Sequence, residues 1–499
     1  MECQVLSTWN QCAPRGYVRQ WFCFPCRQDV NLKNLRNHLV ICLEQLSAQF
    51  PFIKKRVCLL SNPAGYVAFG PEEFPQVPLK VLDQRNTFAF TYGELKAQGF
   101  PAKAFVGPSY GDLPYSLAPG QPGVPVFEVH ARVLKGGLLL CNYCHHSVTD
   151  GLGVDHLMRT FAELSRLSTE DLSVKRPVDV HVDIPQKVIT DFKPELKSMR
   201  YEQLLRLCPE YRQLRSPTGP TQCLMKPDGI PLAQIQKIGQ TFVFSVKKLE
   251  ALQKGILCSK GGSCRKRSPS KFTCLAAITW AHVTKARLSM ARRRSQSSSV
   301  SYPKRIRIML CINWSHRAFG DIMGHASGNT VALPVSSIDT ATILAACSTN
   351  RAESFQALSA ISHTIESTVN SVDEDFVALR TAMFRASPDP RYIGIDLDPR
   401  DPSTFIFNTW RHYGTEVHKW GLPGLGYDGE NQDDSQTGRG ASPDAIRRSQ
   451  SEWNMGAGLI LPAGNDPNIF EVLVTLAIDE MVELCADLSW RQLVDRVLE

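Results

Sequence analysis

The sequence predicts a mixed protein of the α/β (α+β) class that is organised in more than one domain. Its 499 residues exceed the length of an ordinary domain, and 43% hydrophobic with 21% charged residues is a typical globular composition. An apolar run of strand character, ARVLKGGLLLCNYCHH, stands shortly before GVDHLMRTFAELSRL, whose apolar residues recur with the spacing of an amphipathic helix. A stretch rich in Pro and charge, about 171–235, is typical of a connection between two domains.

Composition and charge exclude several classes of partner. The amino terminus, MECQVLSTWNQCAPRGYVRQ, has no basic start followed by an apolar run, so we expect no secretory signal and a cytoplasmic location. No run of about 18 apolar residues occurs, so we expect no membrane span. The net charge is +8, but the basic runs at 264–271 and 291–294 are typical of solvated loops, and no nucleic-acid-binding motif accompanies them. We therefore expect neither a membrane nor a nucleic acid as partner.

The 16 cysteines are expected to be free thiols in a reducing compartment. Two C-x-x-C pairs, Cys23/Cys26 and Cys141/Cys144, raise the alternatives of a zinc site and, because a histidine follows Cys144, of c-type haem attachment. Both pairs lie in segments of strand character, without the tight turn that zinc ligands need. Side chains alternate along a strand, so Cys141 and Cys144 should point to opposite faces and cannot both reach one haem. We expect no metal and no bound cofactor.

The second half of the strand-like run continues as H-H-x-x-x-D-G, from His145 to Gly151. A strand that delivers a histidine to a tight turn before a helix would hold the imidazole at a rigid, partly open edge. Imidazole titrates near neutral pH, so His146 could act there as a general base toward an alcohol or an amine. Asp150 could orient the turn by accepting backbone N–H bonds or by pairing with an arginine, and Gly151 could take a positive φ. A structural histidine is the alternative interpretation of so short a motif.

The motif and its surroundings resemble the BAHD family of CoA-dependent acyltransferases, particularly the fungal branch with the trichothecene acetyltransferases. The opening residues VLSTWNQCAPRGYVRQWFCFP and the following LRNHLVICLEQLSAQFPFIKKRV are similar to the family's first strand and helix, with Asn10 in place of a usual Asp. Five further parts of the chain are similar to segments of this family: 241–254, 270–287, CINWSHRAF, ASGNTV and the ending GLILPAGNDPNIFEVLVTLAIDEMVEL. The resemblance therefore runs nearly from end to end.

This resemblance implies a fold of two chloramphenicol-acetyltransferase-like lobes, each a mixed sheet with helices, with an active-site channel between them. We expect an N-terminal lobe at 1–170 with the H-x-x-x-D motif, a crossover segment at 171–235, and a C-terminal lobe at 236–499 with the CoA-side wall. Four segments are expected to be surface insertions, and the last of them to be mobile: 259–270, 291–304, 387–403 and 427–451.

The resemblance also implies roles for residues of this chain. It carries the general-base role onto His146 and a loop-structuring role onto Asp150. The family's Gly-Asn pair falls on Gly328-Asn329, and the arginine that pairs with the motif's aspartate would fall near Arg317.

A further family motif, D-F-G-W-G, shapes the channel from outside the transfer site. Only its Trp420 and Gly421 are present here, and Val417, His418 and Lys419 stand at its first three positions. We expect this departure to affect local architecture more than chemistry.

The implied reaction moves an acyl group, most simply acetyl, from CoA as co-substrate to a hydroxyl or, less favoured, an amine of a small secondary metabolite. The resemblance places one wall of the CoA mouth at Ser270, Lys266, Arg267 and Lys271, where a helix start and basic side chains would bind phosphates; a solvated, capped loop is the alternative. We expect acyl-CoA and a small acceptor as partners of a monomer.

Two other functions fit the same motif. Condensation domains of peptide synthetases share H-H-x-x-x-D-G and take thioesters from carrier proteins instead of free CoA. A non-catalytic binding protein on the same fold is the second alternative, although the intact motif from His146 to Gly151 argues against it.

Overall fold

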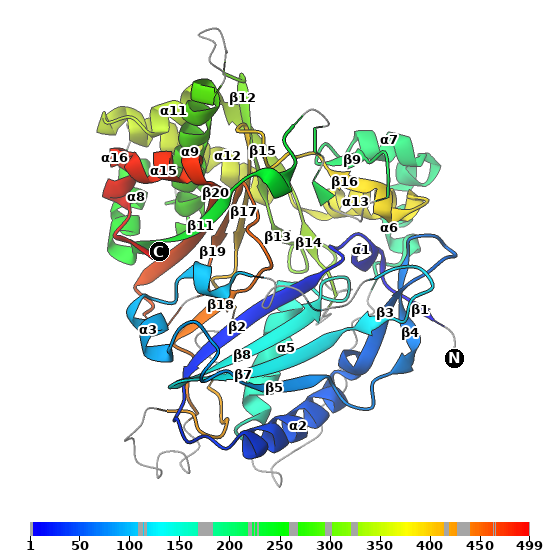
Figure 1. The fold of residues 1–499 in the computed structure, drawn as a ribbon. Coiled ribbons are helices and arrows are strands. Elements are labelled where there is room, and N and C mark those ends of the chain that lie inside the picture. The colour runs from blue at the N-terminus through cyan, green and yellow to red at the C-terminus, as the bar shows by residue number, and fades with distance from the viewer. Residues whose placement is uncertain are drawn as a thin grey trace.

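The computed structural model describes most of the chain between residues 3 and 498. The described residues are 3–107, 113, 117–167, 183–217, 222–223, 225–226, 229–258, 268–294, 302–320, 328–413, 419–426, 440–462, 464 and 466–498. In Figure 1 the blue-to-cyan half of the chain forms one group of strands and helices, and the green-to-red half forms a second group beside it. The arrangement is that of two mixed lobes, as the sequence predicts.

The first lobe is built on a five-stranded sheet in the order β18-β2-β8-β7-β5. Its strands are β2 (Tyr17–Pro25), β5 (Leu79–Asp83), β7 (Phe127–Leu134), β8 (Gly137–His145) and β18 (Ala445–Arg448). The strand predicted from the apolar run is β8, and it lies between β2 and β7 with antiparallel pairing on both sides. A strand bonded on both edges is held firmly, so its end is a rigid support for the residues that follow.

Helices cover both faces of this sheet. On one face α2 (Leu32–Gln49) packs beside α5 (Gly151–Leu164), and their apolar sides share a core with Phe22, Leu140 and Cys144 of the sheet. On the other face α3 (Tyr92–Ala97) and η2 (Ala102–Phe105) cover a smaller core that contains Cys141. The expected opposite orientation of Cys141 and Cys144 is therefore confirmed.

A second, four-stranded sheet completes this lobe in the order β1-β4-β3-β6. Its elements and the short helices next to it are β1 (Gln4–Val5), α1 (Thr8–Gln11), η1 (Pro51–Lys54), β3 (Lys55–Leu59), β4 (Val67–Glu73) and β6 (Val124–Pro125).

The second lobe is built on a seven-stranded sheet in the order β15-β12-β17-β19-β20-β11-β21. The strands are β11 (Lys237–Ser245), β12 (Arg305–Leu310), β15 (Val335–Asp339), β17 (Thr404–Thr409), β19 (Ala457–Ile460), β20 (Ile469–Ala477) and β21 (Arg496–Leu498). The helices beside it are α8 (Val246–Cys258), α9 (Lys271–Arg294), α11 (Thr340–Ala346), α12 (Arg351–Asn370), α15 (Ile478–Ala486) and α16 (Leu488–Leu493). Three predictions agree with this lobe: the strand and helix at 241–254, the helix at 270–287, and the strands and helix near the end of the chain.

The segment expected to cross between the lobes packs with the second lobe where it is described. It contains α6 (Gln186–Phe192), η3 (Pro194–Ser198), α7 (Tyr201–Arg206), β9 (Tyr211–Gln213), β10 (Gln222–Cys223) and η4 (Leu232–Gln234). Helices α6 and α7 contact α13 (Glu374–Ala386), and β9 and β10 flank β16 (Ile393–Ile395), which follows η5 (Pro390–Tyr392). A further ribbon, β13 (Ile312–Asn313) with β14 (Val331–Ala332), lies near α1 between the two groups in Figure 1.

Two of the expected surface insertions are in part structural. The stretch 387–403 contains η5 and β16, and the end of 427–451 forms β18, which pairs with β2 of the first lobe. Those two predictions are therefore wrong for these residues, because polar composition does not exclude a strand whose partner is supplied by a distant part of the chain. Residues 427–439 and most of 259–270 lie outside the described residues, and 291–294 form the last turn of α9. The expected lobe at 236–499 thus gives one strand to the sheet of the other lobe.

Among the described residues, no helix combines the length and the hydropathy that a membrane crossing requires.

Candidate active site

His146 follows directly after the last residue of β8. Its backbone N–H donates to the carbonyl of Gly16 over 2.7 Å, so the turn after β8 is joined to the residue before β2. The side chain is partly exposed, whereas His145 beside it is only 1% exposed. The rigid strand end therefore presents one of the two histidines to open space.

The hydrogen bonds around His146 determine which ring nitrogen carries the proton. The backbone N–H of Asn329 donates to Asn10 Oδ1 over 2.9 Å, and Asn329 Nδ2 donates to the His146 carbonyl and to the same Asn10 Oδ1, each over 2.8 Å. Asn329 Oδ1 is therefore the atom that lies 3.2 Å from His146 Nδ1, and it can only accept. In the neutral ring Nδ1 must carry the hydrogen, which leaves the lone pair on Nε2.

His145 is bonded in a different way. Its Nδ1 accepts the backbone N–H of Ser147 over 3.3 Å, and its ring meets the edge of Tyr17 with 5.1 Å between ring centroids. Burial, reinforced by the charge of Arg15, lowers the pKa of His145 to about 3. This histidine is a neutral part of the packing at any ordinary pH.

Asp150 ties the turn to α5 and to the other lobe. Its Oδ1 accepts the backbone N–H groups of Leu152 and Gly153 over 2.9 and 3.2 Å, the geometry of a helix N-cap. Its Oδ2 accepts the N–H and the hydroxyl of Thr330, both over 2.9 Å, and the amide of Asn313 over 3.4 Å. Of the two roles considered from the sequence, acceptance of backbone N–H bonds is the one observed.

Arg317 does not pair with Asp150. Its guanidinium donates to the carbonyl of Val369 over 3.1 Å, and the side chain is exposed, so the expected arginine–aspartate pair is wrong for this residue. The oxygen of Asp150 that faces the other lobe, Oδ2, is already used by uncharged donors from Asn313 and Thr330. The sequence signal for these donors was present, since Thr330 directly follows Gly328-Asn329.

Gly151 is required for a reason other than the expected positive φ, which it does not have. A Cβ on this residue would lie 2.6 Å from the ring of Tyr413 and 2.7 Å from its hydroxyl oxygen. The glycine therefore permits close approach of the C-terminal lobe to the start of α5.

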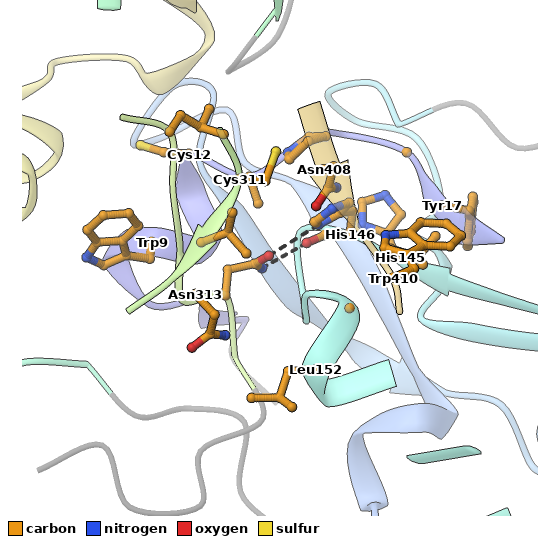
Figure 2. Close-up of a pocket in the computed structure, with 18 of the residues that line it drawn as sticks. Trp9, Cys12, Tyr17, His145, His146, Leu152, Cys311, Asn313, Asn408 and Trp410 are labelled. Carbon is orange, nitrogen blue, oxygen red and sulfur yellow. Dashed lines mark hydrogen bonds between the residues drawn. The ribbon is translucent and has the colours of Figure 1, made fainter. Parts of the chain in front are cut away.

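A cavity of about 920 Å³ lies around His146. Its wall combines residues of both lobes, including Trp9 and Leu152 of the first and Cys311, Asn408 and Trp410 of the second (Figure 2). Asn408 and Cys311 line the same cavity as His146 and are drawn with it in Figure 2. The site is thus assembled from segments more than 250 residues apart in the sequence.

Burial is the main influence on the titration of His146. It lowers the pKa of His146 below the ordinary value, the negative charge of Asp150 and the hydrogen bond to Asn329 act in the opposite direction, and the positive charge of Arg448 lowers it further. The ring is therefore neutral, with a free lone pair, at neutral pH.

The residues expected at the CoA mouth lie away from this cavity or outside the described residues. Ser270 caps α9 by accepting the N–H of Thr273 over 3.0 Å, and Lys271 lies 3.5 Å from Glu250. Neither residue lines the cavity. Lys266 and Arg267 are outside the described residues. The interpretation of Ser270 as a helix cap is observed, and its role toward CoA stays a prediction.

Trp420 and Gly421 stabilise the first lobe. The Trp420 ring packs against Phe22 and Phe161, with centroid distances of 5.6 and 5.2 Å. Gly421 donates its N–H to Ser165 Oγ over 3.0 Å, and a Cβ there would lie 2.4 Å from the Ser165 carbonyl oxygen. Val417 and His418 lie outside the described residues, and Lys419 is exposed.

Sequence reasoning missed most of the cavity wall. Asn408, Trp410, Tyr413 and Arg448 line it, yet each is an ordinary residue in its local sequence. The segment NTWRHYG contains the first three of these residues and lies shortly before Trp420 and Gly421, and this position in the sequence was a signal for them. Nothing in ASPDAIRRSQ, which contains Arg448, indicated a cavity residue.

Comparison with known proteins agrees with the fold. The model of the trichothecene 3-O-acetyltransferase-like N-terminal domain matches residues 17–164. A trichothecene 8-O-acetyltransferase of Fusarium sporotrichioides is 22% identical over 483 residues, with 90% of each chain covered. The structure of F. graminearum TRI101 complexed with coenzyme A and deoxynivalenol aligns over 100% of both chains with a TM-score of 0.70 and 17% identity. Vinorine synthase aligns over 100% of this chain and 95% of its own, with a TM-score of 0.58 and 15% identity.

The fold is thus that of the two-lobe BAHD-like proteins. Within that class, the expected resemblance to the fungal, trichothecene acetyltransferase-like branch is confirmed by the family model and by the relative that covers nearly the whole chain.

Proposed function

We propose that the protein is a CoA-dependent O-acyltransferase in which His146 acts as general base. The observation that carries this proposal is the bonding of His146 in the cavity between the lobes. Asn329 Oδ1 accepts from Nδ1, so the basic Nε2 is left for a proton of the acceptor hydroxyl. Among the described residues Nε2 has no hydrogen-bond partner, and it belongs to a side chain that lines a cavity of about 920 Å³, where a substrate hydroxyl can reach it.

The reaction follows from this geometry. Nε2 of His146 removes the hydroxyl proton as the acceptor oxygen attacks the thioester carbonyl. The tetrahedral oxyanion needs donors, and Asn408 on the cavity wall is a candidate. Its Oδ1 accepts the N–H of Thr409 over 2.7 Å, and its amide N–H groups have no acceptor within the described residues. Collapse of the intermediate expels the CoA thiolate, which takes the proton back from the imidazolium.

Direct transfer is favoured over a covalent acyl-cysteine. Cys12 and Cys311 both line the cavity. Burial raises the pKa of Cys311 to about 12 and that of Cys12 still higher, so both thiols stay protonated and are poor nucleophiles.

Acetyl-CoA is the first donor to test. A curated relative is named as an acetyltransferase, and neighbouring structures contain coenzyme A with T-2 toxin or deoxynivalenol. A hydroxylated small molecule is therefore the proposed class of acceptor, and its identity is open to experiment.

The direct test uses radiolabelled acetyl-CoA and an extract of the producing organism's metabolites. Label should pass to a small molecule with the wild-type protein and not with His146→Ala. Transfer only from an acyl carrier protein would support a condensation-type enzyme instead. Binding of acetyl-CoA without transfer of an acyl group from any CoA thioester to the extract would support a non-catalytic protein and overturn the proposal.

A further inference from the structure

The charge on the cavity wall is unusual. The residues that line it include four arginines, Arg15, Arg19, Arg317 and Arg448, and within the described part of the chain no aspartate or glutamate. Two of the arginines are bonded to the fold. Arg15 donates to the carbonyls of Gln11 and Gly65, and Arg317 donates to that of Val369. A cavity of this kind attracts anions.

Arg448 differs from these arginines. Within the described residues its guanidinium makes no hydrogen bond and no ion pair, and the guanidinium carbon lies 5.9 Å from the centroid of the Trp410 ring. It ends β18, where its Cα is paired with that of Gln20 in β2, so its position is set by the sheet of the first lobe. Burial, with repulsion from Arg19, lowers the pKa of Arg448 to about 10, so it remains charged at neutral pH.

A desolvated guanidinium without a counter-ion is costly, and the planar fork of arginine matches a carboxylate in two parallel hydrogen bonds. We propose that Arg448 binds a carboxylate in this cavity, and that the carboxylate belongs to one of the two substrates. It is carried either by the acyl acceptor or by the acyl group of a dicarboxylic CoA thioester. This inference rests on the proposed acyl transfer and names the substrate chemistry of the same site.

The phosphates of CoA are a less suitable occupant. Arg448 lines the same cavity as His146 and ends a strand that pairs with β2, which in turn pairs with β8, the strand that ends just before His146. When a thioester carbonyl lies at His146, the whole pantetheine arm separates it from the pyrophosphate. A carboxylate close to the reacting hydroxyl or to the reacting carbonyl has no such separation.

Occupation of Arg448 would also affect the base. A bound carboxylate neutralises the guanidinium and removes its lowering influence on the pKa of His146. The base would then become stronger when the correct substrate is present.

The experiment has a donor arm and an acceptor arm. In the donor arm, transfer from malonyl-CoA and succinyl-CoA is compared with transfer from acetyl-CoA. In the acceptor arm, the metabolite extract is divided, and the carboxylic acids of one half are converted to methyl esters before labelled acetyl-CoA is added. Both arms use the wild type, Arg448→Met and the matched control Arg317→Met, which removes a different cation from the same cavity wall.

We expect a preference of about 10- to 100-fold in one arm, as a charge-assisted hydrogen-bonded pair provides. A preference for the dicarboxylic thioesters assigns the carboxylate to the acyl group, and loss of transfer on esterification assigns it to the acceptor. Arg448→Met should abolish that preference and Arg317→Met should keep it. If Arg448→Met does not fold, the substrate preference of Arg448→Gln is compared with that of the wild type instead, and loss of the preference in Arg448→Gln supports the inference.

Transfer that responds to neither carboxylate, or a preference that persists in Arg448→Met, would overturn this inference and leave the proposed acyl transfer intact. Absence of transfer from every thioester in both halves of the extract would instead overturn the proposed function, and this inference with it.

Discussion

Two sides of the same cavity differ in how their polar groups are satisfied. On the side of His146, each bond is specified: Asn329 holds Nδ1, and Asp150 accepts five hydrogen bonds from the turn and from the other lobe. On the side of β18, Arg448 is charged and has no polar partner among the described residues. The first arrangement orients a group of the protein, and the second leaves binding capacity for a ligand.

The comparison also separates two ways of building a site. The His146 side comes from one contiguous stretch, joined to Asn329 and Thr330 across the lobes. The Arg448 side comes from a strand that leaves the second lobe and pairs with β2 of the first. Mutations on the two sides should therefore affect different quantities.

The largest effect is expected for the base itself. His146→Ala should reduce kcat/KM for acyl transfer about 10²- to 10⁴-fold, because proton removal from the acceptor is lost. His145→Ala should reduce it much less, since His145 contributes to packing. Steady-state kinetics of both variants measure this difference, and similar losses for the two would contradict the assignment.

The two sides should shift the pH profile in opposite directions. Only neutral His146 is active, so kcat/KM falls as pH drops through its lowered pKa. Asn329→Ala removes a hydrogen bond that raises the pKa of His146, so the acidic limb of the pH profile should move to lower pH. Arg448→Met removes a positive charge that lowers this pKa, so the acidic limb should move to higher pH. Profiles of kcat/KM from both variants against the wild type provide the measurement, and shifts of the same sign would show that the titrating group is not His146.

Asp150→Asn should act mainly on stability. The substitution leaves one side-chain oxygen for N–H and O–H donors that now use two, and it puts an amide donor among them. We expect a loss of about 1–3 kcal/mol in the free energy of unfolding, measured by urea denaturation. Transfer activity should survive in the folded fraction, with the acidic limb at slightly lower pH. A folded variant without any activity would show that Asp150 takes part in the chemistry.

The last prediction concerns stability alone and tests the described loop around Gly421, residues 419–426. Gly421→Ala places a methyl group 2.4 Å from the Ser165 carbonyl, so the backbone must shift, at an expected cost of about 1–3 kcal/mol. Gly93→Ala is the matched control, because nothing lies within 4 Å of its Cβ position. Thermal unfolding compares them, and equal stability would mean that this loop adapts freely.

Much of the N-terminal lobe was predictable because its signals are local. The apolar run that becomes β8 and the spacing that becomes α5 lie within about thirty consecutive residues, and strand alternation alone placed Cys141 and Cys144 on opposite faces. The turn after His146 was predicted for the same reason. The expected positive φ of Gly151 was wrong, because the requirement for glycine comes from Tyr413, more than 250 residues away.

By itself the sequence determined the strand, the turn and the helix around H-H-x-x-x-D-G, since these depend on periodicity and on residues close in the chain. The order of the other elements in the two lobes was predicted from the resemblance to a known family. Only the tertiary structure decided which nitrogen of His146 is free, that Thr330 and Asn313 take the place expected for Arg317, and that β18 brings Arg448 into the cavity. Hydrogen bonds and desolvation act over a few ångströms in space, whatever the separation along the chain, so a linear pattern does not contain them.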